Sequence, residues 1–415
     1  MWNVKNNHLT LYLTTIFIFT VFWLYIKHNV GNDWGISEWI INYQGGFTRR
    51  GLPGEIAFHV SKFFDLNLRF VIFIFQAFFY TIYLILIFNF FKKIRFNVIF
   101  LLAIYTPIFL LFHLGEVESL ARKEIFLFIG YIWFYNISSK EKPVIYPTLW
   151  IIFILPIICI LYEQTIFYFT FFAAIIIIKL RNDNLLKLLF KILIIFIPAI
   201  TISWFSAFSL ISNEGFDLMK ISLQQNFGES CYGSCSLMSS KKEALQHFIS
   251  TIDKLTEKEN SIFIYLFRYF LILIIGFAPL LILIKHSFLR IKIFKFKGII
   301  YPFLLLNVMV PVHWLMFIDW GRAVNITYVT SIIFYFYLFK NDLIKLNVVY
   351  LKKKINSLFK LITKNDFLKK RKNLPLFIFV IYAFGWCPPT LLSADVNSFP
   401  GYRIPYKTAK ILFSK

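Results

Sequence analysis

Hydrophobic residues follow one another in long runs, interrupted by short polar stretches. A helix that crosses a membrane needs roughly 20 mainly apolar residues, because the hydrocarbon layer is about 30 Å thick. Runs such as 271–284 lack the alternating polarity of a membrane barrel strand, so they predict helices. The expected fold is an all-α polytopic membrane helix bundle, a single domain over 1–415. The eleven predicted helices are 9–27, 69–91, 98–114, 124–137, 147–162, 164–180, 186–212, 262–284, 298–318, 323–339 and 374–392.

Composition supports a membrane protein. Apolar residues make up 59% of the 415 residues and phenylalanine occurs 53 times, which argues against two or three soluble domains. The net charge of +23 would fit a nucleic-acid-binding protein. An excess of lysine and arginine in cytoplasmic loops explains this charge better, so no nucleic-acid partner is expected.

Lysine and arginine are unevenly shared between alternate loops of this arrangement. One set of loops holds about 26 of the 44 basic residues. Because cytoplasmic loops carry such an excess, the N-terminus is predicted to be cytoplasmic and the C-terminus outside. The chain would then be a multi-pass protein of the cell inner membrane, in contact with its lipids. The basic loops are the N-terminus, 92–95, 140–142, 179–191, 285–297 and 340–372.

Two loops on the predicted outer side are long, 28–68 and 212–261. The second contains Cys231 and Cys235 and a short amphipathic pattern near 241–258. On the oxidising side of a membrane the two cysteines can form a disulfide if their Cα atoms approach within about 7 Å, and free thiols are the alternative. A metal site is disfavoured because it would need two further ligands.

The segment 340–373 alternates lysine with leucine, isoleucine and valine. This pattern predicts a basic amphipathic helix on the cytoplasmic leaflet, attracted by anionic headgroups. An anchor is the favoured role, and a functional gate is the alternative.

Charged residues inside a membrane domain are costly, so they are normally paired, hydrated or functional. Adjacent Arg49 and Arg50 lie in a glycine-rich stretch, and their forked donors suit phosphate oxygens. A helix from Ser119 onwards would place Glu118 and Arg122 one turn apart on one face. Ion pairs that staple helices would explain any single charged segment, whereas convergence on the outer face favours a site. The four segments are 31–55, 113–124, 162–164 and 313–322.

Cations at the outer interface suit the diphosphate of a lipid carrier, because they would stabilise a leaving group. Nearby carboxylates or a histidine could accept the proton of a sugar hydroxyl. The expected activity is therefore glycosyl transfer from a polyprenyl-linked donor, with no metal and no cofactor, since the chain lacks an Asp-x-Asp pair, a P-loop and a Rossmann glycine pattern. The candidate catalytic residues are Asp33, Glu38, His113, Glu116 and Asp319. The candidate substrate-binding residues are Arg49, Arg50, Arg122, Lys123, Glu163 and Arg322.

Three stretches, with the overall size and hydropathy, resemble O-antigen and capsule polymerases of the Wzy type from bacterial surface-polysaccharide clusters. They are NYQGGFTRRGL at 42–52, ARKE at 121–124 and DWGR at 319–322. The resemblance implies polymerisation of undecaprenyl-diphosphate-linked repeat units, with outer-face arginines holding the diphosphates and a chain-length regulator protein as a candidate partner. One departure is that the loop 212–261 is modest in size and contains no arginine.

A second resemblance, to glycosyltransferases of the GT-C class, rests on Asp33 and Glu38. Those enzymes carry an essential acid in the first outer loop and use lipid-linked sugars, but they add a single sugar. A lipid-linked oligosaccharide flippase is the non-enzymatic alternative. It would need polar residues along the helices, where charges other than Arg268 are scarce.

Overall fold

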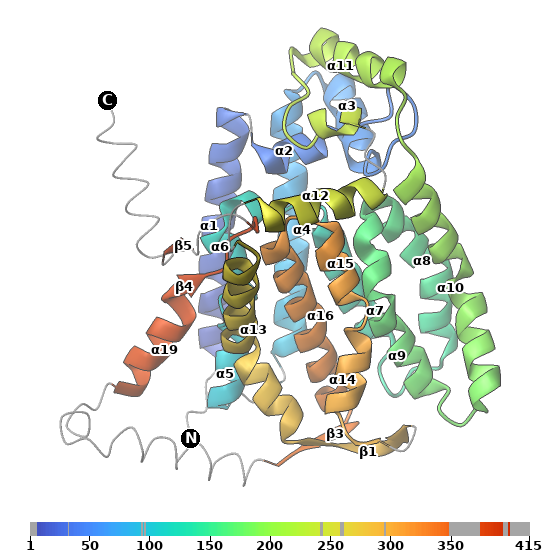
Figure 1. Ribbon diagram of the computed structural model, residues 1–415, viewed down its shortest axis with the longest axis vertical. Helices are drawn as coiled ribbons and strands as arrows, with labels where there is room; N and C mark the ends of the chain where they lie inside the picture. The colour runs from blue at the N-terminus through green and yellow to red at the C-terminus, as the bar shows by residue number, and fades with distance from the viewer. Residues whose placement is uncertain are drawn as a thin grey trace.

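The computed structural model describes residues 6–31, 33–92, 94, 97–240, 244–257, 261–293, 296–347, 374–392 and 397–398. Helices make up most of this part of the chain, and its strands are short (Figure 1). The predicted all-α class is therefore confirmed.

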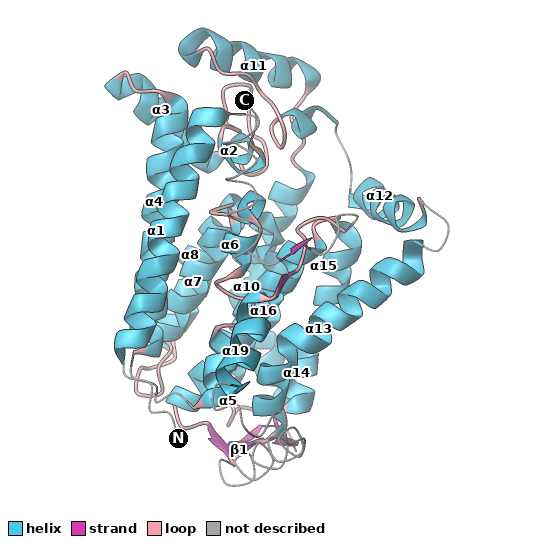
Figure 2. Ribbon diagram, turned by 90° about the vertical axis from the view of Figure 1, so that its left-hand side faces the viewer, coloured by secondary structure: helices cyan, strands magenta, loops and turns pink. Residues whose placement is uncertain are grey.

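Five helices within the described residues are long and apolar enough to cross a membrane, which supports a membrane protein. A helix satisfies its backbone polar groups internally, as a hydrocarbon surrounding requires. α1 and α4 run side by side along one flank (Figure 2). These long helices are α1 (Asn6–Val30), α4 (Leu68–Phe91), α10 (Leu185–Phe208), α13 (Ser261–Lys285) and α16 (Trp320–Lys340).

The other apolar segments form shorter helices. Of the long helices, α16 is the most enclosed, since almost all of its side chains are buried among the others. The shorter apolar helices are α5 (Val98–Ile104), α7 (Glu124–Ile137), α8 (Ile145–Leu161), α9 (Phe169–Lys179), α14 (Ile300–Leu306), α15 (Val310–Met316) and α19 (Leu374–Phe384).

Three predicted helices are interrupted. The segment 98–114 stops being helical after Ile104, and a short helix α6 (Phe112–Gly115) follows the break. The segment 164–180 starts as the 3-10 helix η2 (Glu163–Tyr168). The segment 298–318 is split into α14 and α15, with a proline in the first turn of α15. Proline lacks the N–H that would continue the preceding helix, which explains this last break.

Two further boundaries differ from the prediction. The last helix, expected over 374–392, ends at Phe384 before Pro388 and Pro389, and the short strand β4 (Trp386–Cys387) follows. No helix starts at Ser119: the 3-10 helix η1 (Val117–Ser119) is followed by Ala121 with φ +48°, and α7 begins only at Glu124. The predicted one-turn spacing of Glu118 and Arg122 is therefore wrong.

Buried side chains satisfy the backbone at the break between α5 and α6. Asn325 Nδ2 donates to the carbonyls of Ile108 and Phe109, at 3.0 Å each. The Tyr328 hydroxyl donates to the Ala103 carbonyl at 2.7 Å. Non-helical backbone is tolerated at membrane depth only where protein surrounds it, and α16 provides that surrounding here.

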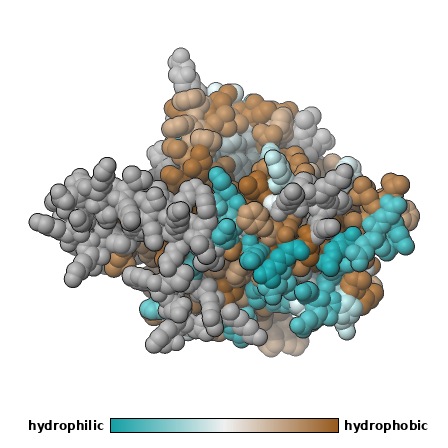
Figure 3. Space-filling model, turned by 90° about the horizontal axis from the view of Figure 1, so that it is seen from below, coloured by the Kyte–Doolittle hydropathy of each residue, from teal (hydrophilic) through white to brown (hydrophobic). Residues whose placement is uncertain are grey.

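Several predicted basic loops lie at one end of the bundle, beside β1 and β3 (Figure 1). Lys179 Nζ donates to the carbonyls of Ser139 and Lys142 in the loop between α7 and α8. Lys340 Nζ donates to the Phe90 carbonyl in the last turn of α4. Viewed from this end, hydrophilic residues form a band between apolar margins (Figure 3). A small antiparallel sheet of order β2-β1-β3 closes this end, made of β1 (Ser287–Ile293), β2 (Phe296–Gly298) and β3 (Ile344–Leu346).

The predicted amphipathic helix over 340–373 is replaced at its start by a turn and by β3, in which Lys345 pairs with Phe288. Residues 348–373 lie outside the described residues. Towards the C-terminus, the strand β5 (Asn397–Ser398) pairs with β4.

The opposite end carries the two long loops. The loop 28–68 forms α2 (Trp34–Trp39) and α3 (Leu52–Phe64), and the loop 212–261 forms α11 (Asn213–Phe227) and α12 (Ala244–Thr256), joined through the 3-10 helix η3 (Ser236–Ser240). α12 confirms the helix expected near 241–258. α2, α3 and α11 lie above the ends of the bundle, and α12 lies across its upper part (Figure 1).

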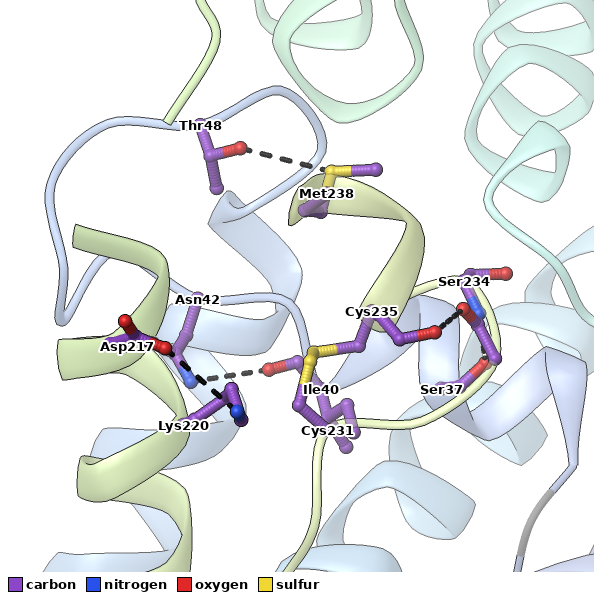
Figure 4. The surroundings of a disulfide bond; sticks show 12 residues. Ser37, Ile40, Asn42, Thr48, Asp217, Lys220, Cys231, Ser234, Cys235 and Met238 are labelled. Atoms are coloured by element: carbon purple, nitrogen blue, oxygen red, sulfur yellow. Dashed lines mark hydrogen bonds and ion pairs between the residues drawn. A yellow bond between two sulfur atoms is a disulfide. The ribbon is translucent and has the colours of Figure 1, made fainter. Parts of the chain in front are cut away.

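The two loops are fastened together around a disulfide between Cys231 and Cys235 (Figure 4). The backbone N–H of Ser234, within the disulfide loop, donates to Ser37 Oγ of α2 at 2.9 Å. Outside that loop, Glu229 forms an ion pair with Arg69 at the start of α4, at 2.5 Å. The disulfide thus closes a small ring within the second long loop, and Ser234 of that ring binds the first loop.

Candidate functional site

The loop 31–55 folds over the broken helix ends. Asp33 caps α2 by accepting hydrogen bonds from the N–H groups of Gly35 and Ile36. Trp39 Nε1 at the end of α2 donates to the Ala121 carbonyl at 3.1 Å, which ties the loop to the segment 113–124. A side chain at Gly54 would place its Cβ 2.0 Å from the Ile41 carbonyl, so glycine permits the close approach of backbone within this loop.

Arg50 links the first charged segment to the third. Its guanidinium forms a forked contact with Glu163, with Nε 2.8 Å from Oε2 and Nη2 2.5 Å from Oε1. Its Nη1 donates to Glu38 Oε1 at 3.1 Å. Arg50 has φ +63°, in the left-handed region that a non-glycine residue rarely adopts. Its side chain is 15% exposed, so these contacts are largely shielded from water.

The second and fourth segments join the same network through two arginines. Arg122 lies 3.5 Å from Glu38 and 3.4 Å from Asp319. Arg322, in the first turn of α16, contacts Asp319 at 2.8 Å and makes a forked contact with Glu124 at 2.6 and 3.1 Å. All four charged segments therefore meet in one place, as the sequence predicted. We call this connected set of ion pairs the charged network.

Lys123 joins the charged network through a hydrogen bond, and we count it as a member. Its side chain is fully buried, and Nζ donates a hydrogen bond to the Arg50 carbonyl. Burial lowers the pKa of Lys123 to about 7, although the Glu38 carboxylate acts in the opposite direction. At neutral pH this amine therefore carries only part of its usual positive charge.

Glu38 is held ionised by its neighbours. Burial alone would raise the pKa of this carboxyl, but the charges of Arg122 and Arg50 outweigh burial and lower the pKa to about 2. A carboxylate with so low a pKa is a weak general base at neutral pH. The geometry therefore favours Glu38 as a residue that positions arginines.

Formal charges in the charged network balance. Four carboxylates oppose four cations, which gives zero if Lys123 is counted as charged. Asp319 is the most accessible member, because its side chain is 30% exposed while the other ion-paired members are at most 15% exposed. The members are Glu38, Arg50, Arg122, Lys123, Glu124, Glu163, Asp319 and Arg322.

Three predicted site residues make hydrogen bonds or ion pairs outside the charged network, and a fourth, Arg49, interacts with it electrostatically. Asp33 pairs with Lys27 at 2.7 Å beside its capping role. Glu116 accepts a hydrogen bond from the Thr390 hydroxyl at 2.9 Å. His113 is buried, with Nδ1 3.2 Å from the Ser119 carbonyl. Burial lowers the pKa of Arg49 and the charge of Glu163 raises it, so Arg49 is an electrostatic neighbour of the charged network.

Glu124 was included in a charged segment but not among the predicted site residues. Its partner Arg322 lies 198 positions away, so only the folded chain identifies the pair. Sequence reasoning also missed a buried polar chain beside the charged network. Gln164 Oε1 accepts a hydrogen bond from the Tyr162 hydroxyl at 2.6 Å and lies 3.1 Å from His313 Nε2. The other ring nitrogen of His313, Nδ1, is 3.0 Å from the Tyr168 hydroxyl.

The arrangement is suited to holding an anion without a metal. Four cations lie within one buried site, and a low local dielectric strengthens their attraction for negative charge. An incoming anion would have to exchange with a carboxylate, and Asp319 is the accessible one, shared by two arginines.

The chain matches no protein family model, no curated protein and no solved structure.

Proposed function

We propose that this protein polymerises undecaprenyl-diphosphate-linked oligosaccharide repeat units into a surface polysaccharide at the outer face of the bacterial inner membrane. The observation that carries the proposal is the convergence of four distant charged segments into one buried charged network. Arginines in such a surrounding suit a diphosphate, because their forked donors match its oxygens.

In the proposed reaction, a hydroxyl oxygen of one repeat unit attacks the anomeric carbon of the glycan on a second carrier. The bond from that carbon to the diphosphate oxygen breaks, and the diphosphate leaves with the electron pair. Arg122 and Arg322 would hold the leaving group in place of Asp319. The hydroxyl proton would pass to the Asp319 carboxylate, the most accessible acid of the charged network.

We place eleven crossings in the inner membrane, with the N-terminus in the cytoplasm and the C-terminus outside. The grouping of basic loops at one end of the bundle supports this orientation. The broken segments would count as crossings, because α5 with α6, η2 with α9, and α14 with α15 each continue along the bundle. The charged network would then open towards the outer leaflet.

A GT-C-type transferase that adds a single sugar is the second candidate. It is favoured by Glu38, an acid from the first outer loop that lies within the charged network. Both candidates use a polyprenyl-linked donor and differ in product. A chain-length regulator would be a partner only of the polymerase.

The products that accumulate when the gene is removed distinguish the candidates. Polymerase loss should abolish the polysaccharide ladder while complete single-unit glycolipid remains at the outer face, as gel electrophoresis and lipid mass spectrometry would measure. A unit lacking one sugar would indicate the GT-C activity, and complete units retained at the cytoplasmic face would indicate a flippase. Either of these results contradicts polymerisation.

Complementation then tests the site. The wild-type gene should restore the ladder, whereas Asp319→Asn should restore less than about a hundredth of it, the scale of a lost acid–base group. Asp217→Asn is the matched control. Asp217 on α11 is 65% exposed, and its ion pair with Lys220, at 3.8 Å, lies at the surface. A normal ladder with Asp319→Asn would remove this residue from the mechanism.

The disulfide tests the orientation. If the end with α11 is outside, a membrane-impermeant maleimide should label the partly exposed Cys231 in intact cells only after treatment with an impermeant reductant. Cys159 and Cys387 are buried and should stay unlabelled in both samples. Labelling that requires permeabilised cells would reverse the proposed orientation.

A further inference from the structure

An apolar cavity of about 840 Å³ lies between α13 and the helices α12, α15 and α16. Several of its lining side chains are exposed, so it opens at the surface of the bundle rather than within the core. Its size falls within the usual range for small-ligand sites. The lining residues include Leu266, Phe267, Tyr269, Phe270, Trp314 and Trp320.

Three aromatic residues form the inner wall of this cavity. The ring centroids of Tyr269 and Trp320 are 5.1 Å apart, and those of Trp314 and Trp320 are 5.5 Å apart. Trp320 Nε1 donates to the Trp314 carbonyl at 2.8 Å, which fixes the indole. The wall is therefore preformed, and the indole N–H of Trp320 is satisfied, whereas the buried Trp314 Nε1 has no hydrogen-bond partner among the described residues.

The cavity adjoins the charged network. Trp320 directly follows Asp319 and precedes Arg322 by two residues, so one turn of α16 contributes both to the aromatic wall and to the network. Asp319 is also the most exposed member of the network. An apolar cavity next to buried arginines matches a molecule with an apolar chain and an anionic head.

We infer that this cavity binds the first isoprene units of a polyprenyl diphosphate, with the diphosphate directed towards Arg122 and Arg322. The inference rests on the proposed function and adds the site of the carrier chain. Branched isoprene units match the aromatic and leucine walls, and the remainder of the chain would lie in the bilayer beside α13. The cavity would thus align the diphosphate with the charged network.

Binding of farnesyl diphosphate and of inorganic diphosphate to the purified full-length protein in detergent tests this inference. Leu266→Trp fills the cavity and should weaken farnesyl diphosphate binding at least tenfold, while inorganic diphosphate binding stays unchanged. The matched control is Leu281→Trp, an exposed position of the same helix that does not line the cavity. It should bind both compounds as the wild type does.

The other outcomes are separable. If Leu266→Trp binds farnesyl diphosphate normally while inorganic diphosphate still binds, the cavity does not hold the chain, but the charged network keeps its proposed role. If the wild type binds neither compound, the proposed function itself is overturned. If dioleoyl phosphatidylglycerol displaces farnesyl diphosphate at equal concentration, the cavity holds bilayer lipid in general and the inference is wrong.

Discussion

Replacing Arg50 with alanine should destabilise the protein by about 3–5 kcal/mol, the usual effect of removing one partner from a buried ion pair. Glu163 would lose its forked contact and Glu38 would lose one of its two arginines. Buried Glu163 would then lack its ion-pair partner, and Glu38 would keep only Arg122. Unfolding of the purified protein in detergent, followed by intrinsic tryptophan fluorescence, would measure the change.

The matched control for Arg50→Ala is Arg290→Ala. Arg290 lies 3.5 Å from Asp342, but both side chains are about half exposed or more, so little change in stability is expected. A double-mutant cycle with Glu163→Gln should show strong coupling between Arg50 and Glu163. Equal effects of the two alanine variants, or additive effects in the cycle, would contradict the buried network.

Replacing Arg322 with alanine should abolish the polysaccharide ladder and also destabilise the protein by about 3–5 kcal/mol. Glu124 would be left buried without its forked partner, and Asp319 would keep only Arg122. Arg322→Lys should remain defective, because a lysine ammonium cannot make the forked contact. The ladder and the thermal unfolding of the same variants are the two measurements.

A double variant separates the functional role of Arg322 from its structural role. Arg322→Met with Glu124→Leu replaces the buried pair by apolar side chains of similar size, which is often neutral or stabilising. The double variant should therefore unfold close to the wild type and still produce no ladder. Recovery of both stability and ladder would mean that this pair serves only to hold helices together.

The sequence predicted the meeting of the charged segments because a membrane restricts the chain strongly. If apolar runs alternate in direction and the basic loops mark one side, the segments 31–55, 113–124, 162–164 and 313–322 are expected together on the other side. The side chain of Glu163 is 8% exposed and paired with Arg50, as expected of a costly charge inside a membrane domain.

Pairing within the site could not be predicted from the sequence. Arg50 and Glu163 are 113 positions apart, and neither hydropathy nor local spacing relates them. The helical spacing of Glu118 and Arg122 does not occur, for a local reason. Ala121 adopts a left-handed conformation, so the expected helix does not form and Arg122 turns towards Glu38 and Asp319.

Hydropathy also could not predict where the apolar helices break. The segments 98–114 and 298–318 are apolar throughout most of their length, yet each is divided. Distant side chains stabilise the broken backbone: Asn325 from α16 in the segment 98–114, and Thr170, which donates to the Leu306 carbonyl, in the segment 298–318. In an apolar surrounding, such tertiary contacts are needed to satisfy the backbone polar groups that a break in a helix leaves without partners.

The sequence distance between the partners of the charged network affects how the protein can change during evolution. A substitution of Arg322 or Glu124 alone leaves a buried charge, so tolerated changes at these two positions should occur together. The same holds for Arg50 and Glu163. Exposed apolar positions such as Phe153 leave no buried charge when they change, so they can be replaced by other apolar residues independently. In distant homologues with little overall sequence similarity, these covarying charge pairs should therefore still be recognisable.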